Sequence, residues 1–303
     1  MTAPLPLRDG IAPSYLWLPE GQWPNLLAFL IQRFPHVGEA VLLQRMAKGD
    51  LVGDQGPLDA NSPYRQGGRI WYYREVPVEM PVPFEAVVLH RDQRLLVVDK
   101  PHFLPMIPSG QYLHETLLIR LRKQLDLPQL TPVHRLDRET AGVVLFCLDP
   151  AYRGAYQTLF ERREISKRYE AIAPYRPSLD LPHVHRSRMV ESGKAFAMHE
   201  VAGEPNSETR VDLIERLGEY ARYRLEPHTG RKHQLRLHMA SLGIPILNDP
   251  LYPEVLAHKG EDFSKPLQLL ARSIEFADPV SGELRCFTSE RSLTGEMPSL
   301  PQE

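Results

Sequence analysis

The stretch Pro132-Val-His-Arg-Leu-Asp-Arg-Glu-Thr-Ala-Gly-Val-Val-Leu-Phe146 decides how this chain folds and where its chemistry lies. Its second half opens an uncharged run from Ala141 to Leu148, rich in Val, Leu and Phe, which is typical of a buried strand. Asp137 comes just before this run. We therefore expect Asp137 on a loop that the strand holds in place, where catalytic groups often lie.

Two arginines, Arg135 and Arg138, flank Asp137. Nearby cations favour the ionised form of a carboxyl group, and an ionised, positioned aspartate can act as a nucleophile or a base. The same pattern also suits a loop aspartate that only forms a structural ion pair. Local chemistry alone leaves both interpretations open.

The segment His134 to Gly142, HRLDRETAG, resembles the HRLDxxTSG signature of the RluA-type pseudouridine synthases. Further segments resemble motifs of the same family, in the family's order over roughly residues 84–290: Val97-Val-Asp-Lys-Pro101, Lys167-Arg-Tyr-Glu-Ala171, and Gly230-Arg-Lys-His-Gln-Leu-Arg-Leu-His238 with its continuation from Gly243 to Tyr252. Three positions depart from the family pattern: Ala141 stands for Ser, Asn248 for Gly and Leu270 for His.

The resemblance implies an α+β fold, in which a mixed, largely antiparallel sheet with flanking helices carries the active cleft. It implies an isomerase that converts specific uridines of structured RNA, ribosomal or transfer, to pseudouridine after the base has been flipped from the stack. By resemblance Asp137 is the nucleophile, Tyr169 stacks on the base and assists proton transfer, and Arg236 pairs with the aspartate. The resemblance also assigns substrate binding to Arg135, Lys167, Arg231, His233 and Leu269.

No organic cofactor and no metal are expected, because one carboxylate can carry the reaction. The sequence has no P-loop, no GxGxxG and no CxxC pair. His233 and His238, with His183 and His185, could be metal ligands, but no Cys or acidic cluster accompanies them in the sequence. A kinase is excluded because the order of its catalytic loop, HRDLxxxN, differs.

The composition bounds the partners and the compartment. The net charge of −2 argues mildly against RNA, but residues 222–238 hold five Lys or Arg and one acid, so the basic excess falls on a motif. Only two cysteines, no secretory signal and no apolar stretch of roughly 20 residues predict a cytoplasmic protein without a membrane span. We expect a monomer with RNA as its partner.

Two domains are predicted, residues 1–80 and 81–303, with a proline-rich linker at the boundary. Leu26, Leu30 and Phe34 recur at helical spacing, and a second helix and short strands follow. The first domain resembles a small α/β-type RNA-binding domain first described in a ribosomal small-subunit protein. It has seven Lys or Arg against eight acids, so RNA binding and a packing role both remain open.

A rival hypothesis comes from another class of protein: an RNA-binding or ribosome-associated protein that keeps the fold without the reaction. Such a protein is expected to lose at least one of Asp137, Tyr169 and Arg236, and this chain keeps all three. A phosphodiesterase that uses Asp137 would need a metal or a histidine pair on the carboxylate, and neither is evident in the sequence.

Overall fold

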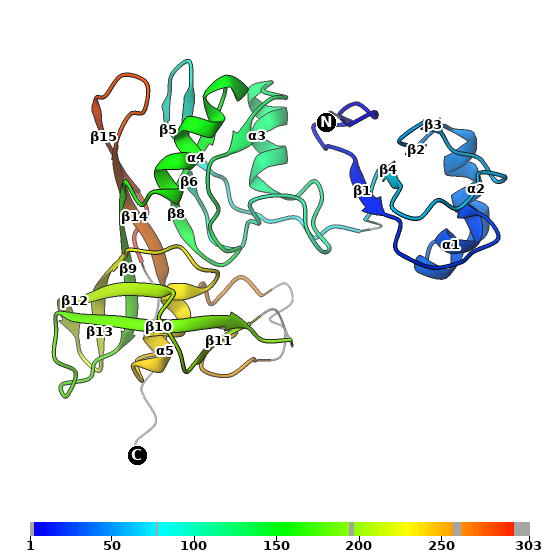
Figure 1. Ribbon diagram of the computed structural model, residues 1–303. Helices are drawn as coiled ribbons and strands as arrows, with labels where there is room; N and C mark the ends of the chain where they lie inside the picture. The colour runs from blue at the N-terminus through cyan, green and yellow to red at the C-terminus, as the bar shows by residue number, and fades with distance from the viewer. Residues whose placement is uncertain (1–2, 77, 194–196, 257–261, 294–303) are drawn as a thin grey trace. The chain divides into compact units, whose positions relative to one another are not determined.

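The computed structural model describes residues 3–76, 78–193, 197–256 and 262–293 (Figure 1). It divides into two compact units, the first made of residues 1–79, 108–114 and 119–128, and the second of residues 80–107, 115–118 and 129–303. The boundary near residue 80, as a limit of independent folding, stays a prediction.

The first unit contains a four-stranded antiparallel sheet in the order β1-β4-β2-β3. The strands are β1 (Ser14–Trp17), β2 (Leu51–Gly53), β3 (Gly56–Pro57) and β4 (Arg69–Tyr72), and the helices are α1 (Leu26–Arg33) and α2 (Glu39–Ala47). Asn25 begins α1, because its side chain accepts a hydrogen bond from the backbone N–H of Ala28 at 2.8 Å. The predicted helices and strands are present, and β1 and β3 are additional strands that the sequence did not indicate.

The second unit is built on an eleven-stranded sheet. Its main path runs β11-β10-β12-β13-β9-β14-β8-β6-β5, while β7 pairs with β8 and β15 with β14. The bounds are β5 (Val87–Arg91), β6 (Leu95–Lys100), β7 (Thr131–Pro132), β8 (Ala141–Cys147), β9 (Ile165–Pro174), β10 (His183–Glu191), β11 (Met198–Val201), β12 (Ser207–Leu217), β13 (Tyr220–Pro227), β14 (Leu269–Ala277) and β15 (Leu284–Thr288). All recorded pairs are antiparallel except β8 with β14, which confirms a mixed, largely antiparallel sheet.

Three further α-helices are α3 (Leu117–Leu125), most of which belongs to the first unit, and α4 (Arg153–Glu161) and α5 (Gln234–Ser241) of the second, and a 3-10 turn (Pro150–Tyr152) precedes α4. One buried cluster joins α4 to β6, β8 and β14 through side chains such as Leu145, Tyr156 and Ile274. Another joins α5 to β9 and β13 through Leu225, Leu235 and others. The structure therefore confirms the α+β fold class. Every helix in the described part of the chain is too short or too polar to cross a bilayer.

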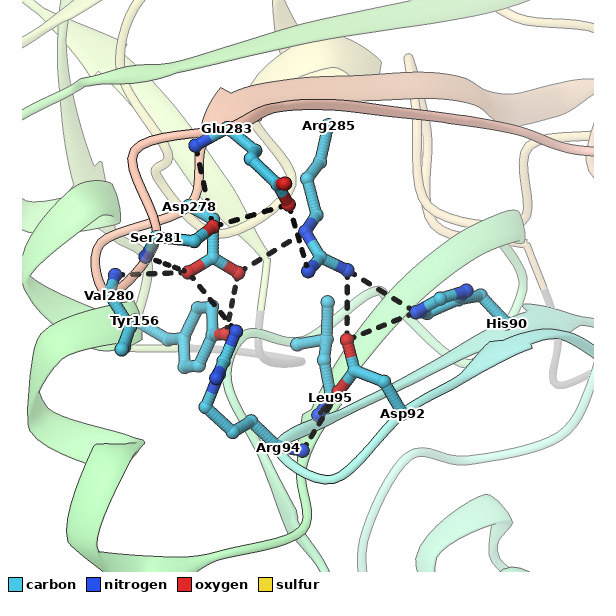
Figure 2. A network of polar contacts seen from close by, with 10 residues as sticks. All are labelled: His90, Asp92, Arg94, Leu95, Tyr156, Asp278, Val280, Ser281, Glu283 and Arg285. Carbon is cyan, nitrogen blue, oxygen red and sulfur yellow. Dashed lines mark hydrogen bonds and ion pairs between the residues drawn. The ribbon is translucent and has the colours of Figure 1, made fainter.

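A polar network ties the β5–β6 turn and α4 to the β14–β15 turn (Figure 2). Arg285 donates to Asp92 at 2.8 Å and lies 3.3 Å from Asp278, which also accepts the Tyr156 hydroxyl at 2.9 Å. Burial raises the pKa of Tyr156 to about 12, so the phenol keeps its proton and donates. Burial favours a higher pKa for Asp92, but backbone N–H groups, His90 and Arg285 outweigh it and lower the pKa. The network fixes the ends of three elements that pack on β8.

The strand β14 lies between β8 and β9, and its residue Ala271 pairs with Gly142 on one side and with Tyr169 on the other. Gly142 has a φ of +116°, and a Cβ at this position would collide with the backbone of Ala271. A glycine is thus required where β8 meets β14. This close contact between β8 and β14 sets the distance between β8, which follows Asp137, and β9, which carries Tyr169.

Candidate active site

Asp137 lies on the loop between β7 and β8, as the sequence predicts. Its carbonyl accepts a hydrogen bond from the Thr140 N–H at 3.2 Å, which closes a tight turn ahead of β8. Its side chain is 29% exposed, so the carboxylate is open to a substrate while the buried strand anchors the loop. Of the two flanking arginines, Arg135 is exposed, and Arg138 donates from Nε to the Phe103 carbonyl at 3.1 Å.

The cation that faces Asp137 is Arg236 on α5. Its Nη1 donates to Asp137 Oδ2 at 3.2 Å, while Nε and Nη2 donate to the two carboxylate oxygens of Asp249 at 2.7 and 2.6 Å. Asp249 in turn accepts the backbone N–H groups of Leu251 and Tyr252. Burial favours a lower pKa for Arg236, but the hydrogen bond and charge of Asp249, and then Asp137, outweigh it and raise the pKa. The guanidinium is therefore a fixed, permanently charged partner for Asp137.

Tyr169 is on β9, which is separated from β8 by β14. Its ring packs against the buried cluster that contains Leu269, and Leu269 pairs with Ala171 in the strand register. Burial, and then the negative charge of Asp137, raise the pKa of Tyr169. The phenol is consequently neutral at physiological pH, able to donate a proton, and under the influence of the carboxylate.

His233 begins α5 in a left-handed conformation, with a φ of 54°. Its Nε2 lies 3.9 Å from Asp137 Oδ2, and its Nδ1 lies 3.1 Å from the hydroxyl of Tyr252. Burial lowers the pKa of His233, although the charge of Asp137 acts in the opposite direction. A neutral imidazole thus lies beside the carboxylate.

Three other cations expected at the site do not contact Asp137 in the described part of the chain: Lys167, Arg231 and Arg135. Lys167 donates to the Thr229 carbonyl at 3.3 Å, and burial, with Arg163 nearby, lowers the pKa of Lys167 to about 8. Arg231 is exposed and donates to the Asn206 carbonyl at 3.2 Å. The structure therefore brings Asp137, Arg236, His233 and Tyr169 together and does not bring Lys167, Arg231 or Arg135 into contact with the carboxylate.

Sequence reasoning missed the parts of Asp249 and Tyr252. Both lie in the quoted motif that continues from Gly243 to Tyr252, and this motif was the one available signal. Which cation Asp249 would hold cannot be read from the motif, because Arg236 and Asp249 meet only after α5 and the following loop have folded.

A buried lysine, Lys100 at the end of β6, was also missed. It is 0% exposed, and its Nζ donates to the carbonyls of Pro101, Leu104 and Arg138 at 2.9, 2.8 and 3.0 Å. The last of these carbonyls belongs to Arg138, the residue after Asp137, so the hydrogen bond from Lys100 holds the Asp137 loop in place. Burial lowers the pKa of Lys100 to about 7, against the opposing charges of Glu139 and Asp137.

The histidines considered as metal ligands divide into two places. His233 lies beside Asp137, whereas His185 and His238 lie together with Glu200. The argument that these histidines lack an acidic partner is therefore wrong, because the pairing of β11 with β10 places Glu200 beside them.

Comparison with known proteins agrees with this geometry. A sequence model of the family described as RNA pseudouridylate synthase matches residues 94–241. An uncharacterised RNA pseudouridine synthase of Synechocystis is 31% identical over 234 residues, which are 75% of this chain and 79% of that protein. The dual-specificity RNA pseudouridine synthase RluA of Salmonella typhi is 34% identical over 209 residues, 66% of this chain and 91% of the relative. The chain belongs to the RNA pseudouridine synthase family.

Solved structures of the family share the fold. The human RNA pseudouridylate synthase domain containing 4 matches with a TM-score of 0.52 and 28% identity, covering 67% of this chain and 87% of that one. The human RNA pseudouridylate synthase domain containing 1 matches with a TM-score of 0.57 and 23% identity, covering 71% and 86%, which supports the fold alone. The resemblance of the sequence motifs to RNA-modifying isomerases is confirmed.

Proposed function

We propose that this RNA pseudouridine synthase isomerises specific uridines of structured ribosomal or transfer RNA, with Asp137 as the nucleophile and the target base flipped out of its stack. One observation carries the proposal: the carboxylate of Asp137 is partly exposed, and a buried arginine that Asp249 orients holds it from one side. The substrate faces the open side of the carboxylate.

The reaction balances without an added reactant. The bond between the base nitrogen N1 and the ribose carbon C1′ breaks, the uracil turns, and a bond forms between C5 and C1′. The hydrogen on C5 leaves as a proton and N1 takes up a proton in its place, so no atom or electron is gained or lost overall.

Each neighbour has a role that its contacts support. Arg236 keeps Asp137 ionised and oriented through a charge-assisted hydrogen bond. Tyr169, with its proton retained, replaces the lost base stacking and assists proton transfer as a donor. Leu269 supplies an apolar wall, and Arg135, Lys167, Arg231 and His233 bind the RNA backbone or the flipped nucleotide.

The exposed Arg135, on the loop of Asp137, is suited to fill the space that the base leaves. Lys167, with a pKa near 8, is largely charged at neutral pH and can contact a phosphate. The first unit contributes either RNA affinity or packing. We propose a cytoplasmic monomer that needs no metal or organic cofactor for this reaction.

The test uses RNA transcribed with tritium at C5 of uridine. The wild-type protein should release one equivalent of tritium to water for each site modified, with no free uracil, and free uridine or its monophosphate should be inert. Activity should survive chelation and desalting. Ribosomal and transfer RNAs from cells that lack the gene, assayed separately, identify the substrate class.

Asp137→Asn keeps the shape of the side chain but removes its charge, so tritium release should disappear while RNA binding persists. Asp180→Asn, at an exposed loop position of the same unit, is the matched control and should turn over normally. Free uracil in place of pseudouridine would indicate a glycosidase. Tight RNA binding without release from any cellular RNA would favour the non-catalytic alternative.

A further inference from the structure

Outside the surroundings of Asp137, one cluster has the composition of a metal site. His185 on β10, Glu200 on β11 and His238 on α5 place one ligand atom each within 4.8 Å of one another. The Nε2 of His185 lies 2.9 Å from Glu200 Oε1, and the Nε2 of His238 lies 4.0 Å from the same oxygen. The two imidazole rings are 4.6 Å apart between centroids.

We infer that His185, Glu200 and His238 form a binding site for a single zinc ion that joins α5 to strands β10 and β11. Two histidines, one glutamate and a water molecule are an established zinc ligand set. Zinc–ligand bonds of about 2.0–2.2 Å place tetrahedral ligand atoms about 3.3 Å apart. His185 Nε2 and Glu200 Oε1 are already within this separation at 2.9 Å. Glu200 and His238, 4.0 Å apart, must approach by about 0.7 Å, and the ligand atoms of the two histidines, which lie within 4.8 Å of each other, by up to about 1.5 Å.

The donor set suits a cation. Two imidazoles and one carboxylate give the cluster a single acidic group, and a metal ion binds the deprotonated nitrogen of each imidazole and the carboxylate oxygen.

A second layer of contacts orients His238. Thr209 Oγ1 lies 2.9 Å from Nδ1 of His238 and accepts a hydrogen bond from Gln234 Nε2 at 2.9 Å. Ser207 Oγ, 3.0 Å from Nε2, donates its proton to the Ser187 carbonyl at 2.7 Å, so it accepts from His238 when no ion is bound. On zinc binding the His238 proton moves to Nδ1, where Thr209 accepts it, which is the usual outer-layer support of a ligating histidine.

The site is reachable and has a structural consequence. The side chains of His185 and Glu200 are 17% and 24% exposed, whereas His238 is fully buried at 0%. An ion can thus enter from solvent between His185 and Glu200 and reach the buried imidazole of His238. His238 follows Arg236 by two residues on α5. The ion would therefore hold α5 against the sheet, and α5 also carries Arg236, the partner of Asp137. The inference does not depend on the proposed reaction, because the ion is not placed at the reacting atoms.

The experiment measures metal binding directly, on the full chain without an affinity tag. Cys286 is exposed and could bind zinc on its own, so the background is Cys286→Ser. After chelation and desalting, calorimetric titration should show one equivalent of zinc, and cobalt substitution should give the intense visible absorption of a tetrahedral centre. Zinc should also raise the melting temperature.

Glu200→Gln and His185→Asn, both at partly exposed positions, should abolish the stoichiometric binding and the melting shift. Thr209→Val should keep one equivalent but weaken the affinity by about 10–100-fold. His199→Ala, the neighbour of Glu200 on β11 with an exposed side chain, and His183→Ala are the matched controls and should bind like the parent.

No stoichiometric binding by the parent protein would overturn the inference and leave the cluster a hydrogen-bond network. Binding that persists in both Glu200→Gln and His185→Asn would do the same, because the ion would then lie elsewhere. In either case tritium release from RNA, which tests Asp137, would be unaffected. The two proposals therefore fail separately.

Discussion

Replacing Lys100 by Met should change how the stability of the second unit depends on pH. The ammonium is fully buried, and burial lowers the pKa of Lys100 from 10.5 to about 7. A difference of about 3.5 pKa units corresponds to about 5 kcal/mol between the two protonation states. This penalty applies fully below pH 7, where the lysine is charged in both the folded and the unfolded chain.

The sign follows from proton linkage. As the pH rises through about 7, the folded state loses the proton, whereas the unfolded state keeps it until about pH 10.5. The unfolded state then binds more protons, so the free energy of unfolding of the wild type should rise by about 1.4 kcal/mol per pH unit within this window. Between about pH 6.5 and about pH 9, Lys100 alone should contribute about 2–3 kcal/mol, and Lys100→Met should lack this contribution.

Denaturant unfolding at the two pH values measures the effect, followed by far-ultraviolet circular dichroism. Tryptophan fluorescence is unsuitable, because Trp17, Trp23 and Trp71 all belong to the first unit. Comparing variant with wild type cancels the titration of other groups such as Lys167, whose pKa is about 8. Lys48→Met removes an exposed lysine and should leave the pH dependence unchanged.

If wild type and Lys100→Met differed in stability by the same amount at both pH values, Lys100 would not lose its proton in this window, and the reasoning would be refuted. The variant should also turn over more slowly at every pH, because the carbonyl of Arg138 loses the donor that braces the Asp137 loop. Single-turnover tritium release measures this second effect.

Three further substitutions test the site and the sheet. Tyr169→Phe should bind RNA like the wild type but lower the single-turnover rate by about 10²–10⁴-fold, and an unchanged rate would remove its hydroxyl from the mechanism. Asp249→Asn leaves its buried arginine partner half-paired, so it should cost about 3–5 kcal/mol of stability in denaturant unfolding and slow the reaction; wild-type behaviour in both assays would contradict its orienting role. Gly142→Ala, strained at φ +116° and in collision with the backbone of β14, should cost at least about 1–3 kcal/mol. Gly154→Ala, in open space on α4, should be neutral or stabilising, and equal losses at both glycines would refute the close-approach argument.

Those parts of the fold that local patterns determine could be predicted from the sequence. The run from Ala141 to Leu148 contains the fully buried β8, and α5 ends at Ser241, two residues before Gly243, whose φ of +74° suits a glycine. The motifs also pointed to Asp137, Tyr169 and Arg236, which the structure brings together, while their catalytic roles stay predictions.

The remaining features depend on contacts between distant segments. The parallel pairing of β8 with β14 joins residues more than a hundred positions apart, and no periodicity signals it. Glu200 lacks any local sign that it will meet His185 and His238, because the register of β10, β11 and α5 brings them together. Lys100 reads as an exposed charge until its three carbonyl partners are known.

The position of β14 has a consequence for synthesis. The strand that follows Asp137 and the strand that carries Tyr169 are joined through residues 269–277, which leave the ribosome after Asp137, Tyr169 and Arg236 have been made. A nascent chain that ends before residue 269 contains Asp137, Tyr169 and Arg236 but lacks the strand between the two halves of the sheet. Long-range pairing of this kind forms slowly. The nascent chain should therefore stay inactive on nearby RNA until β14 has emerged and been inserted into the sheet.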